Sequence, residues 1–302
     1  MWFIDYNFKN NLKEMCRLLI ESNGRFNSSL DWSLGRLIDW KYGLWNESKF
    51  NPDFHRQNSH LWRNYMGEML AFVISENGDE SIQVITHPNY EYLFSQVIDF
   101  ALKNWLPERK TLSIVTAEQD KERIRTLLKY GFKELGHCES SYLYHINDIS
   151  LPVIKLSEEL TIQTMAENGD YEEQLDLKNN AFHQDKPISD MYRIANEYVR
   201  TSPIYDSDMD FVIVNQEGRH VAGCEGFIDY ENRLMEIERI CTRDAYRNQG
   251  LSKAIISACI QKGYKKGIQR FHISAWNEVT HKVYASFGEY EKIDRYEFKI
   301  EG

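Results

Sequence analysis

The sequence has no uninterrupted apolar run that approaches the roughly 20 residues needed by a membrane-spanning helix. Its opening residues, M-W-F-I-D-Y-N-F-K-N, also lack the basic and apolar segments of a secretory signal peptide. These two absences argue against a membrane partner and against secretion. We therefore expect a cytoplasmic protein.

Cysteine is scarce, and its spacing carries no signature. The five cysteines are odd in number, widely scattered and without a C-x-x-C pair, so the sequence indicates neither a disulfide framework nor a zinc site. We expect them to be buried thiols. The nine histidines show no H-E-x-x-H or other ligand spacing, and we predict no metal.

Basic residues are too few to balance the acidic ones, and the net charge of −10 divides into −3 up to Ser150 and −7 after it. With no basic stripe and an acidic second half, the sequence argues against a nucleic-acid partner. The same field favours a small cationic substrate. The alternative is that the acidity only maintains solubility.

The length of 302 residues and the apolar content of 42% are enough for two ordinary hydrophobic cores. The stretch N-D-I-S-L-P near residue 150 disfavours helix and marks a linker. We therefore expect domains at 1–150 and 151–302. Periodicity predicts helices at 12–20, 30–44, 92–105, 121–129, 173–182, 188–200, 251–264 and 279–287. It predicts strands at 65–75, 81–86, 111–116, 160–165, 210–215, 221–230, 234–242 and 270–275, with a strand pair at 132–145 and another at the end.

The two halves repeat each other. An ungapped shift of 157 residues places 130–132 opposite 287–289 and also places 84–95 opposite 241–252. One offset for two segments argues for two copies of one domain, although a chance match is the alternative. The shift places Arg247 opposite Tyr90, Gly250 opposite Leu93, Asn277 opposite Asp120 and Tyr284 opposite Leu127.

The stretch 234–258 reads as a strand ending at Thr242, a short polar turn and an Ala/Ile-rich helix. A helix start offers backbone N–H groups without intrahelical partners and a partial positive charge, and glycine lets a phosphate approach them. The order R-x-x-G-x-S matches neither G-x-G-x-x-G nor G-x-x-x-x-G-K-[ST], both of which are absent. The turn predicts a phosphate cradle, although strand, loop and helix follow one another in most α/β proteins.

Four features resemble, in order and spacing, those of the GNAT N-acetyltransferases: the strand E-I-E-R-I-C-T, the turn R-N-Q-G-L-S, S-A-W-N-E with Asn277, and H-K-V-Y-A-S-F-G with Tyr284. Ser252 departs from the usual Gly or Ala. The resemblance spans most of 160–300, and a degenerate copy covers the first half. It implies an α+β or α/β fold with two tandem GNAT-like domains, each a mixed, mostly antiparallel sheet flanked by helices.

The resemblance also implies a cosubstrate, acetyl-CoA, and the residues that hold it. The pyrophosphate is expected at backbone donors from Asn248 to Lys253, with Arg247 adding a charge-assisted contact. Pantetheine is expected to pair with backbone groups of a splayed strand, and Asn277 to contact the cofactor. Arg247 as a surface arginine and Asn277 as a helix N-cap are the alternatives. The expected cofactor-binding residues are Ile240, Cys241, Thr242, Arg247, Asn248, Gln249, Gly250, Leu251, Ser252, Lys253, Asn277 and Tyr284.

Acyl transfer to an alkylamine requires a base, because the amine has a pKa near 10 and is protonated at neutral pH. Glu236 and Glu238 lie two apart on one strand face and are the candidates; the alternative is that both are solvated. Tyr284 matches the general acid of the family, with a core tyrosine as the alternative. The run of Asp206, Asp208 and Asp210 precedes a strand that borders the acceptor cleft in the family, although most such runs are solvated loops.

Together these features predict an acetyl-CoA-dependent N-acetyltransferase that acts on a primary amine of a small molecule by direct attack in a ternary complex. A non-catalytic acyl-CoA-binding or regulatory protein, or an acyltransferase with another donor, are the alternatives. The sequence identifies neither the acceptor amine nor the base, does not show whether the first half shapes the acceptor site, and does not separate a monomer from a homodimer.

Overall fold

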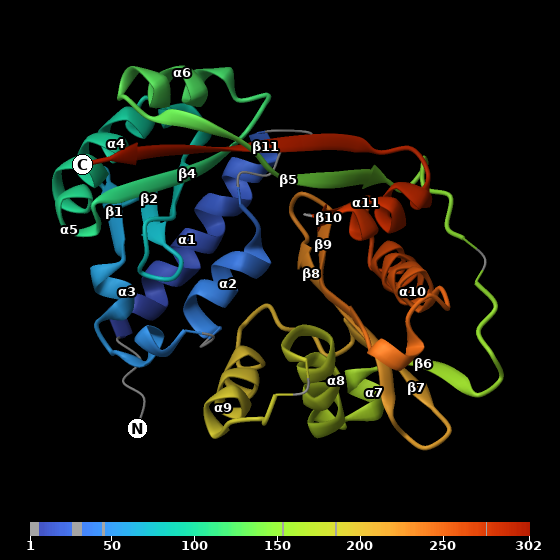
Figure 1. Ribbon diagram of the computed structural model, residues 1–302. Helices are drawn as coiled ribbons and strands as arrows, with labels where there is room; N and C mark the ends of the chain where they lie inside the picture. Colours follow the sequence, from blue (N-terminus) through green and yellow to red (C-terminus); the bar gives the residue numbers. More distant parts are fainter. Residues whose placement is uncertain (1–5, 26–31, 44–45, 153, 185, 276) are drawn as a thin grey trace. The chain divides into compact units, whose positions relative to one another are not determined.

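The computed structural model describes residues 6–25, 32–43, 46–152, 154–184, 186–275 and 277–302 (Figure 1). The chain forms two compact units. Unit 1 comprises Met1–Lys41, Trp45–Ser140 and Ile293–Gly302, and unit 2 comprises Tyr42–Leu44 and Ser141–Lys292. The mixed α/β fold, with sheets flanked by helices, agrees with the predicted fold class.

Unit 1 contains a three-stranded antiparallel sheet and a further strand group in the order β4-β11-β5. Its strands are β1 (Ser59–Arg63), β2 (Met69–Ser75), β3 (Ile82–Thr86), β4 (Thr111–Ala117), most of β11 (Glu291–Glu301) and the first part of β5 (Lys133–His145). Its helices are α1 (Tyr6–Arg25), α2 (Leu34–Tyr42), η1 (Glu47–Phe50), α3 (Phe54–Gln57), η2 (Pro88–Tyr90), α4 (Leu93–Asn104), α5 (Leu106–Arg109) and α6 (Lys121–Lys129).

Unit 2 arranges its strands in the order β5-β10-β9-β8-β7-β6. The strands are β6 (Leu160–Thr164), β7 (Asp210–Asn215), β8 (His220–Asp229), β9 (Leu234–Thr242) and β10 (Arg270–Ala275), with the end of β5. The helices are α7 (Met165–Asn168), α8 (Tyr171–His183), α9 (Asp190–Val199), η3 (Asp244–Tyr246), α10 (Leu251–Lys265), α11 (Glu278–Tyr284) and η4 (Ala285–Phe287).

The two predicted strand pairs, at 132–145 and at the end of the chain, are wrong: each stretch is one long strand. The first part of β5 belongs to unit 1, and its last residues belong to unit 2, where Ile146 N donates to Gln269 O. Conversely, β11 runs into unit 1 and pairs antiparallel with β4, from Arg295 opposite Ala117 to Glu301 opposite Thr111 (red beside green in Figure 1). Unit 1 therefore includes β11 from the second half of the sequence, and unit 2 includes the end of β5 from the first half. No periodicity in the sequence indicates that exchange.

Other differences are local. The strand β1 lies in a stretch for which no strand is predicted, and residues 30, 31 and 44 of the helix predicted at 30–44 lie outside the described residues. Cys224, Cys241 and Cys259 are buried as expected, whereas Cys138 is exposed. It lies in the half of β5 that forms an edge of the unit 1 strand group and is exposed along most of its length.

The internal repeat is visible in the capping of two helices. Asp120 accepts a hydrogen bond from Arg123 N at the start of α6, and Asn277 accepts one from Thr280 N at the start of α11. Both pairs are 157 residues apart, as the predicted offset requires. The two halves therefore repeat the same helix start with the same chemistry.

Helix α10 packs closely on β8 and β9 because glycine faces it. A Cβ added to Gly226 on β8 would lie 2.8 Å from Met235 Sδ, and one added to Gly263 on α10 would lie 3.0 Å from Met235 Cε. The buried residues Ile255, Ile256 and Cys259 complete this contact. This packing holds the last turn of α10 against the beginning of β9. No helix within the described residues is long and apolar enough to cross a membrane.

Candidate active site

The loop between β9 and α10 leads from Thr242 to Leu251, and the side chain of Ile154 packs beside its Gly250. Asn248 and Gly250 have left-handed φ values of 63° and 79°, and the first helical hydrogen bond is Ala254 N to Gly250 O at 3.1 Å. Gly250 is the N-cap and supplies no side-chain hydrogen bond. The N–H groups of Leu251, Ser252 and Lys253 therefore have no intrahelical acceptor and lie at the positive end of the helix dipole.

Arg247 is exposed, as its alternative reading required, with its side chain held at the loop. Its Nη2 lies 2.6 Å from Asp244 Oδ1 and its Nε donates to Thr242 O at 3.3 Å. Ser252 Oγ lies 3.3 Å from Thr242 Oγ1, so the small hydroxyl bridges the strand end and the helix start. Gln249 is exposed beside them.

Arg243 anchors the beginning of this loop, and sequence reasoning missed it. Its side chain is only 6% exposed and donates from Nη2 to Glu173 at 3.1 Å and to Asp176 at 2.9 Å, and from Nε to His220 O at 3.1 Å. A buried, fully paired arginine ties the strand end to α8. It stands in the quoted sequence as T-R-D, but nothing in that pattern separates it from a surface arginine.

The strand β9 separates from β10 as the resemblance implied. Their parallel pairing covers only Arg270 to His272 opposite Leu234 to Glu236. Beyond Glu236, no further pair joins the two strands among the described residues. The backbone of β9 near Ile240 and Thr242, both half-buried, and of buried Cys241 thus lies past the point of separation.

A bulge in β9 contributes to this geometry. The register between β8 and β9 shifts between Gly223 and Glu225, opposite Cys241 and Glu238, and Arg239 takes a left-handed φ of 51°. A non-glycine residue in this region is strained and persists only where its surroundings hold it. The Arg239 guanidinium donates to the buried carboxylate of Glu225, which fixes the bulge.

Glu225 belongs to a buried charge cluster that sequence reasoning also missed. Lys178 Nζ on α8 lies 2.6 Å from its Oε1. Burial alone would raise the pKa of Glu225, but the charges of Arg239 and Lys178 outweigh it and lower that pKa. Asp210 lies in the same cluster, where burial and the charge of Glu225 raise its pKa to about 6. The only sequence signal for this cluster was that Glu225 and Lys178 each lie within an apolar stretch.

The two candidate bases differ in burial. Glu236 is buried and Glu238 is half-buried. Met235 and Ile237, which alternate with them, belong to the core beneath α10, so both glutamates lie on the opposite face of β9. Of the two, Glu238 is close enough to Tyr284 for its charge to act on the tyrosine.

Tyr284 is a buried side chain at the end of α11, which agrees with the core reading of that residue. Burial first, and then the charge of Glu238, raise the pKa of its phenol, so it keeps its proton at neutral pH. The hydroxyl of Tyr144 donates a hydrogen bond to the backbone carbonyl of Tyr284. The ring centroids of Tyr142 and Tyr284 lie 6.3 Å apart. Both tyrosines come from the end of β5, and hence from the first half of the sequence.

Two further predicted contacts have structural partners. Asn277 is the N-cap of α11 and accepts from Thr280 N at 3.0 Å, the alternative considered for it. In the acidic run, Asp208 lies 3.0 Å from Lys262 of α10 and Asp206 lies 3.0 Å from Lys266, the residue after α10. These two carboxylates are paired but partly exposed loop residues, whereas Asp210 is buried. Within the described residues no group of three or more His, Cys, Asp or Glu is placed to hold a metal ion.

Comparison with known proteins gives a family match for part of the chain and similar folds for most of it. Residues 171–288 match the acetyltransferase (GNAT) family. A GCN5-related N-acetyltransferase from Sphaerobacter thermophilus is 15% identical with a TM-score of 0.58, covering 97% of this chain and 94% of its own. A tandem GNAT protein from the clavulanic acid biosynthesis pathway is 10% identical with a TM-score of 0.61, over 98% and 96%.

A third similar structure is the C-terminal domain of a putative lysylphosphatidylglycerol synthetase from Agrobacterium fabrum, at 10% identity and a TM-score of 0.55, over 97% of this chain and 92% of its own. At identities this low, these similarities show a shared fold alone. The comparison with curated protein sequences gives no match.

Proposed function

Residues 171–288 belong to the acetyltransferase (GNAT) family, and from this premise we propose that the chain transfers an acyl group from acyl-CoA, with acetyl-CoA as donor, to a primary amine of a small molecule. The predicted division into a degenerate domain at 1–150 and a catalytic domain at 151–302 is part of this proposal. The exchanged strands make β5 a contributor to the catalytic unit.

The observation that carries the proposal is the uncapped start of α10 beside the separated strands. The left-handed Asn248 and Gly250 precede a first helical turn whose N–H groups have no side-chain cap. A diphosphate suits such a helix start, where the dipole and several donors act together. Arg247 at the rim adds a cation, and the backbone at Cys241 lies past the strand separation, where pantetheine can pair with it.

The catalytic roles rest on the residue types and on their places beside the separated strands. Tyr284 is the general acid of this proposal: its phenol, protonated at neutral pH as an ordinary tyrosine is, donates its proton to the sulfur as the carbon–sulfur bond breaks. Glu238 acts on the same region through its charge and is the better placed of the two candidate bases to accept the ammonium proton. The amine then attacks the acyl carbon directly, and the thiol leaves as the tetrahedral intermediate collapses.

The test combines binding and turnover. Isothermal titration of the full chain with acetyl-CoA and with CoA should give one site, and thiol release from acetyl-CoA should depend on one or more members of a panel of primary amines. Binding without turnover of any amine would favour the non-catalytic alternative. Thiol release with another acyl-CoA but not with acetyl-CoA would show that the acyl donor is that other acyl-CoA. Absence of any CoA binding would overturn the proposal.

A further inference from the structure

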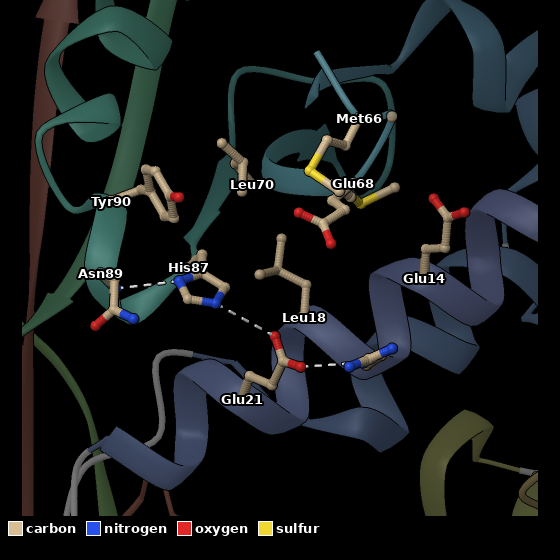
Figure 2. A pocket seen from close by; sticks show the side chains of 12 residues that line it. Glu14, Leu18, Glu21, Met66, Glu68, Leu70, His87, Asn89 and Tyr90 are labelled. Atoms are coloured by element: carbon tan, nitrogen blue, oxygen red, sulfur yellow. Dashed lines mark hydrogen bonds and ion pairs between the residues drawn. The ribbon is translucent and has the colours of Figure 1, made fainter. Parts of the chain in front are cut away.

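Unit 1 contains a pocket of about 500 Å³ at the place where its own loop between β3 and α4 begins (Figure 2). Leu18 of α1, Leu70 of β2 and Met66 of the turn before β2 give it apolar walls, and Tyr90 of η2 adds an aromatic ring. The volume is within the range of small-molecule sites, which combine apolar walls with a few polar groups.

The ionised groups that line this pocket are three carboxylates, Glu14 and Glu21 from α1 and Glu68 from the turn before β2, and one guanidinium, Arg17 of α1. Glu14 pairs with Arg63, and Glu21 lies 3.0 Å from Arg17 and 3.7 Å from His87 Nε2. Glu68 accepts from the amide of Asn64 at 2.6 Å, a neutral partner. The pocket therefore carries negative charge that the described cations do not fully balance.

The internal repeat shows what fills this position in unit 2. The turn before β2 and the turn before β8 have the same hydrogen bonds: Asn64 N to Glu68 O matches Asn215 N to Arg219 O, each at 3.0 Å. Both turns have a left-handed glycine, Gly67 and Gly218. By this equivalence Glu68 stands where unit 2 has Arg219.

The next strand gives a second equivalence. His87 N donates to Leu70 O at 2.8 Å and Arg243 N donates to Val221 O at 2.9 Å. Leu70 and Val221 lie two residues after Glu68 and Arg219, so the two equivalences agree. His87 therefore stands where unit 2 has the buried Arg243.

In unit 2 these two positions hold guanidinium groups that pair with carboxylates of α8. Arg219 and Arg243 lie 3.3 Å and 2.9 Å from Asp176 Oδ2, and Arg243 is almost completely buried. In unit 1 the helix keeps its carboxylates, but one arginine position is a histidine and the other is a glutamate. Neither of these two positions therefore supplies a guanidinium, and the pocket lies there; Arg17 and Arg63, which pair with Glu21 and Glu14, come from other positions.

We propose that this pocket of unit 1 binds an organic guanidinium cation with an apolar chain, which takes the place that arginine side chains occupy in unit 2. The guanidinium pairs with Glu68 and Glu21, planar donors against carboxylates. The apolar chain of the ligand lies against Leu18, Leu70 and Met66. The ring face of Tyr90 contacts the guanidinium cation. This ligand site is distinct from the acyl-transfer site and does not depend on it.

The test uses n-butylguanidinium chloride as the probe and n-butylurea as its neutral isostere. With the full chain labelled at methionine methyl carbons, the signals of Met66 and Met69, both at the pocket, should shift on titration with n-butylguanidinium. Signals of Met209 and Met235, buried in the core of unit 2, should stay in place. The urea should give no saturable shift.

Three variants sharpen the result. Glu68→Gln should raise the Kd of the probe at least about tenfold, because the charge is lost and the shape is kept. His87→Arg should abolish binding and raise the Tm, because it supplies the internal guanidinium that unit 2 has. Glu122→Gln, a matched change at a side chain 80% exposed on α6, should alter neither.

Equal binding of the urea, unchanged binding in Glu68→Gln or His87→Arg, or no shift of Met66 and Met69 would each overturn the proposal. Because these titrations contain no acyl-CoA, such a result leaves acyl transfer unaffected. Conversely, loss of acyl-CoA binding elsewhere in the chain does not change the expected shifts.

Discussion

The loop that opens α10 and the loop that opens α4 occupy the same place in the two units, and the phosphate cradle is proposed for the first of them only. Tyr90 N bonds to His87 O as Tyr246 N bonds to Arg243 O, so Tyr90 corresponds to Tyr246. After that point unit 2 has four residues, 247–250, before the helix, and unit 1 has two, 91–92. The ungapped pairing of Tyr90 with Arg247 and of Leu93 with Gly250 is therefore wrong, because the first copy has lost two residues.

The shorter loop also differs in charge and conformation. Glu91 follows Tyr90 where Arg247 follows Tyr246, and its carboxylate accepts from Thr86 Oγ1 at 2.7 Å and faces the buried Arg123. Glu91 and Tyr92 are both in the right-handed helical region, in contrast to Asn248 and Gly250. Loop length, backbone handedness and charge have all changed against anion binding, which teaches that a cradle is lost through its loop while the fold remains.

The largest expected effect comes from Tyr284, the proposed general acid, which stands opposite Leu127 of unit 1 in the 157-residue repeat. Tyr284→Phe should lower kcat by about 10²–10⁴-fold, the usual contribution of a general acid. Steady-state thiol release measures it, with acetyl-CoA titration as the control, which should be unchanged. Undiminished turnover in a variant that binds acetyl-CoA normally would remove Tyr284 from the mechanism.

The next effect tests the loop itself. Replacing residues 247–250 by Glu-Tyr, the sequence of the shorter loop, should weaken CoA binding by about 100-fold or more, because the uncapped N–H groups and the cation are lost together. Isothermal titration measures the Kd. Circular dichroism and Tm serve as the control for folding. Retained binding would show that the comparison of the two loops does not explain where CoA binds.

A smaller effect isolates the charge at the rim. Arg247→Gln should raise the Kd of CoA about tenfold at low salt, the value of one charge-assisted contact, and the ratio should shrink as salt increases. Arg125→Gln, at a side chain 73% exposed on α6, is the matched control and should change nothing. If the Kd of CoA at low salt is the same for Arg247→Gln and for the unchanged protein, Arg247 is a surface residue without a role in CoA binding.

The smallest effect tests the repeat. Asn277→Ala and Asp120→Ala each remove an N-cap hydrogen bond, and each should lower the free energy of unfolding by about 1 kcal/mol. Urea denaturation measures both. If Asn277→Ala also weakens CoA binding while its stability loss matches that of Asp120→Ala, the side chain has a cofactor role besides the cap. Unchanged binding would leave it a cap alone.

Much of the fold could be predicted from the sequence because its signals are local. Helix α6, strand β7 and strand β10 occupy the predicted residues or nearly so, and both N-caps fall at the predicted offset. Strand β1 was missed because S-H-L-W-R has no clear alternation. The long strands β5 and β11 were mistaken for pairs because their partners lie in the other half of the chain, and non-local pairing leaves no period in the sequence.

The candidate site divides in the same way. The turn from Arg247 to Ser252 and the tyrosine of α11 could be recognised from residue order. The anchoring Arg243, the bulge at Arg239 and the pairing of Glu225 with Lys178 could not, because each depends on residues far apart in the chain.

By itself, the sequence determined the element types, the internal repeat and the chemistry of the β9–α10 turn, because backbone preference and hydrophobic period act over a few neighbouring residues. Only the tertiary structure decided that the halves exchange their last strands, that Tyr142 and Tyr144 flank Tyr284, and that arginines filling one unit are missing from the other. These outcomes depend on which distant segments pack together, and packing is settled by the whole core.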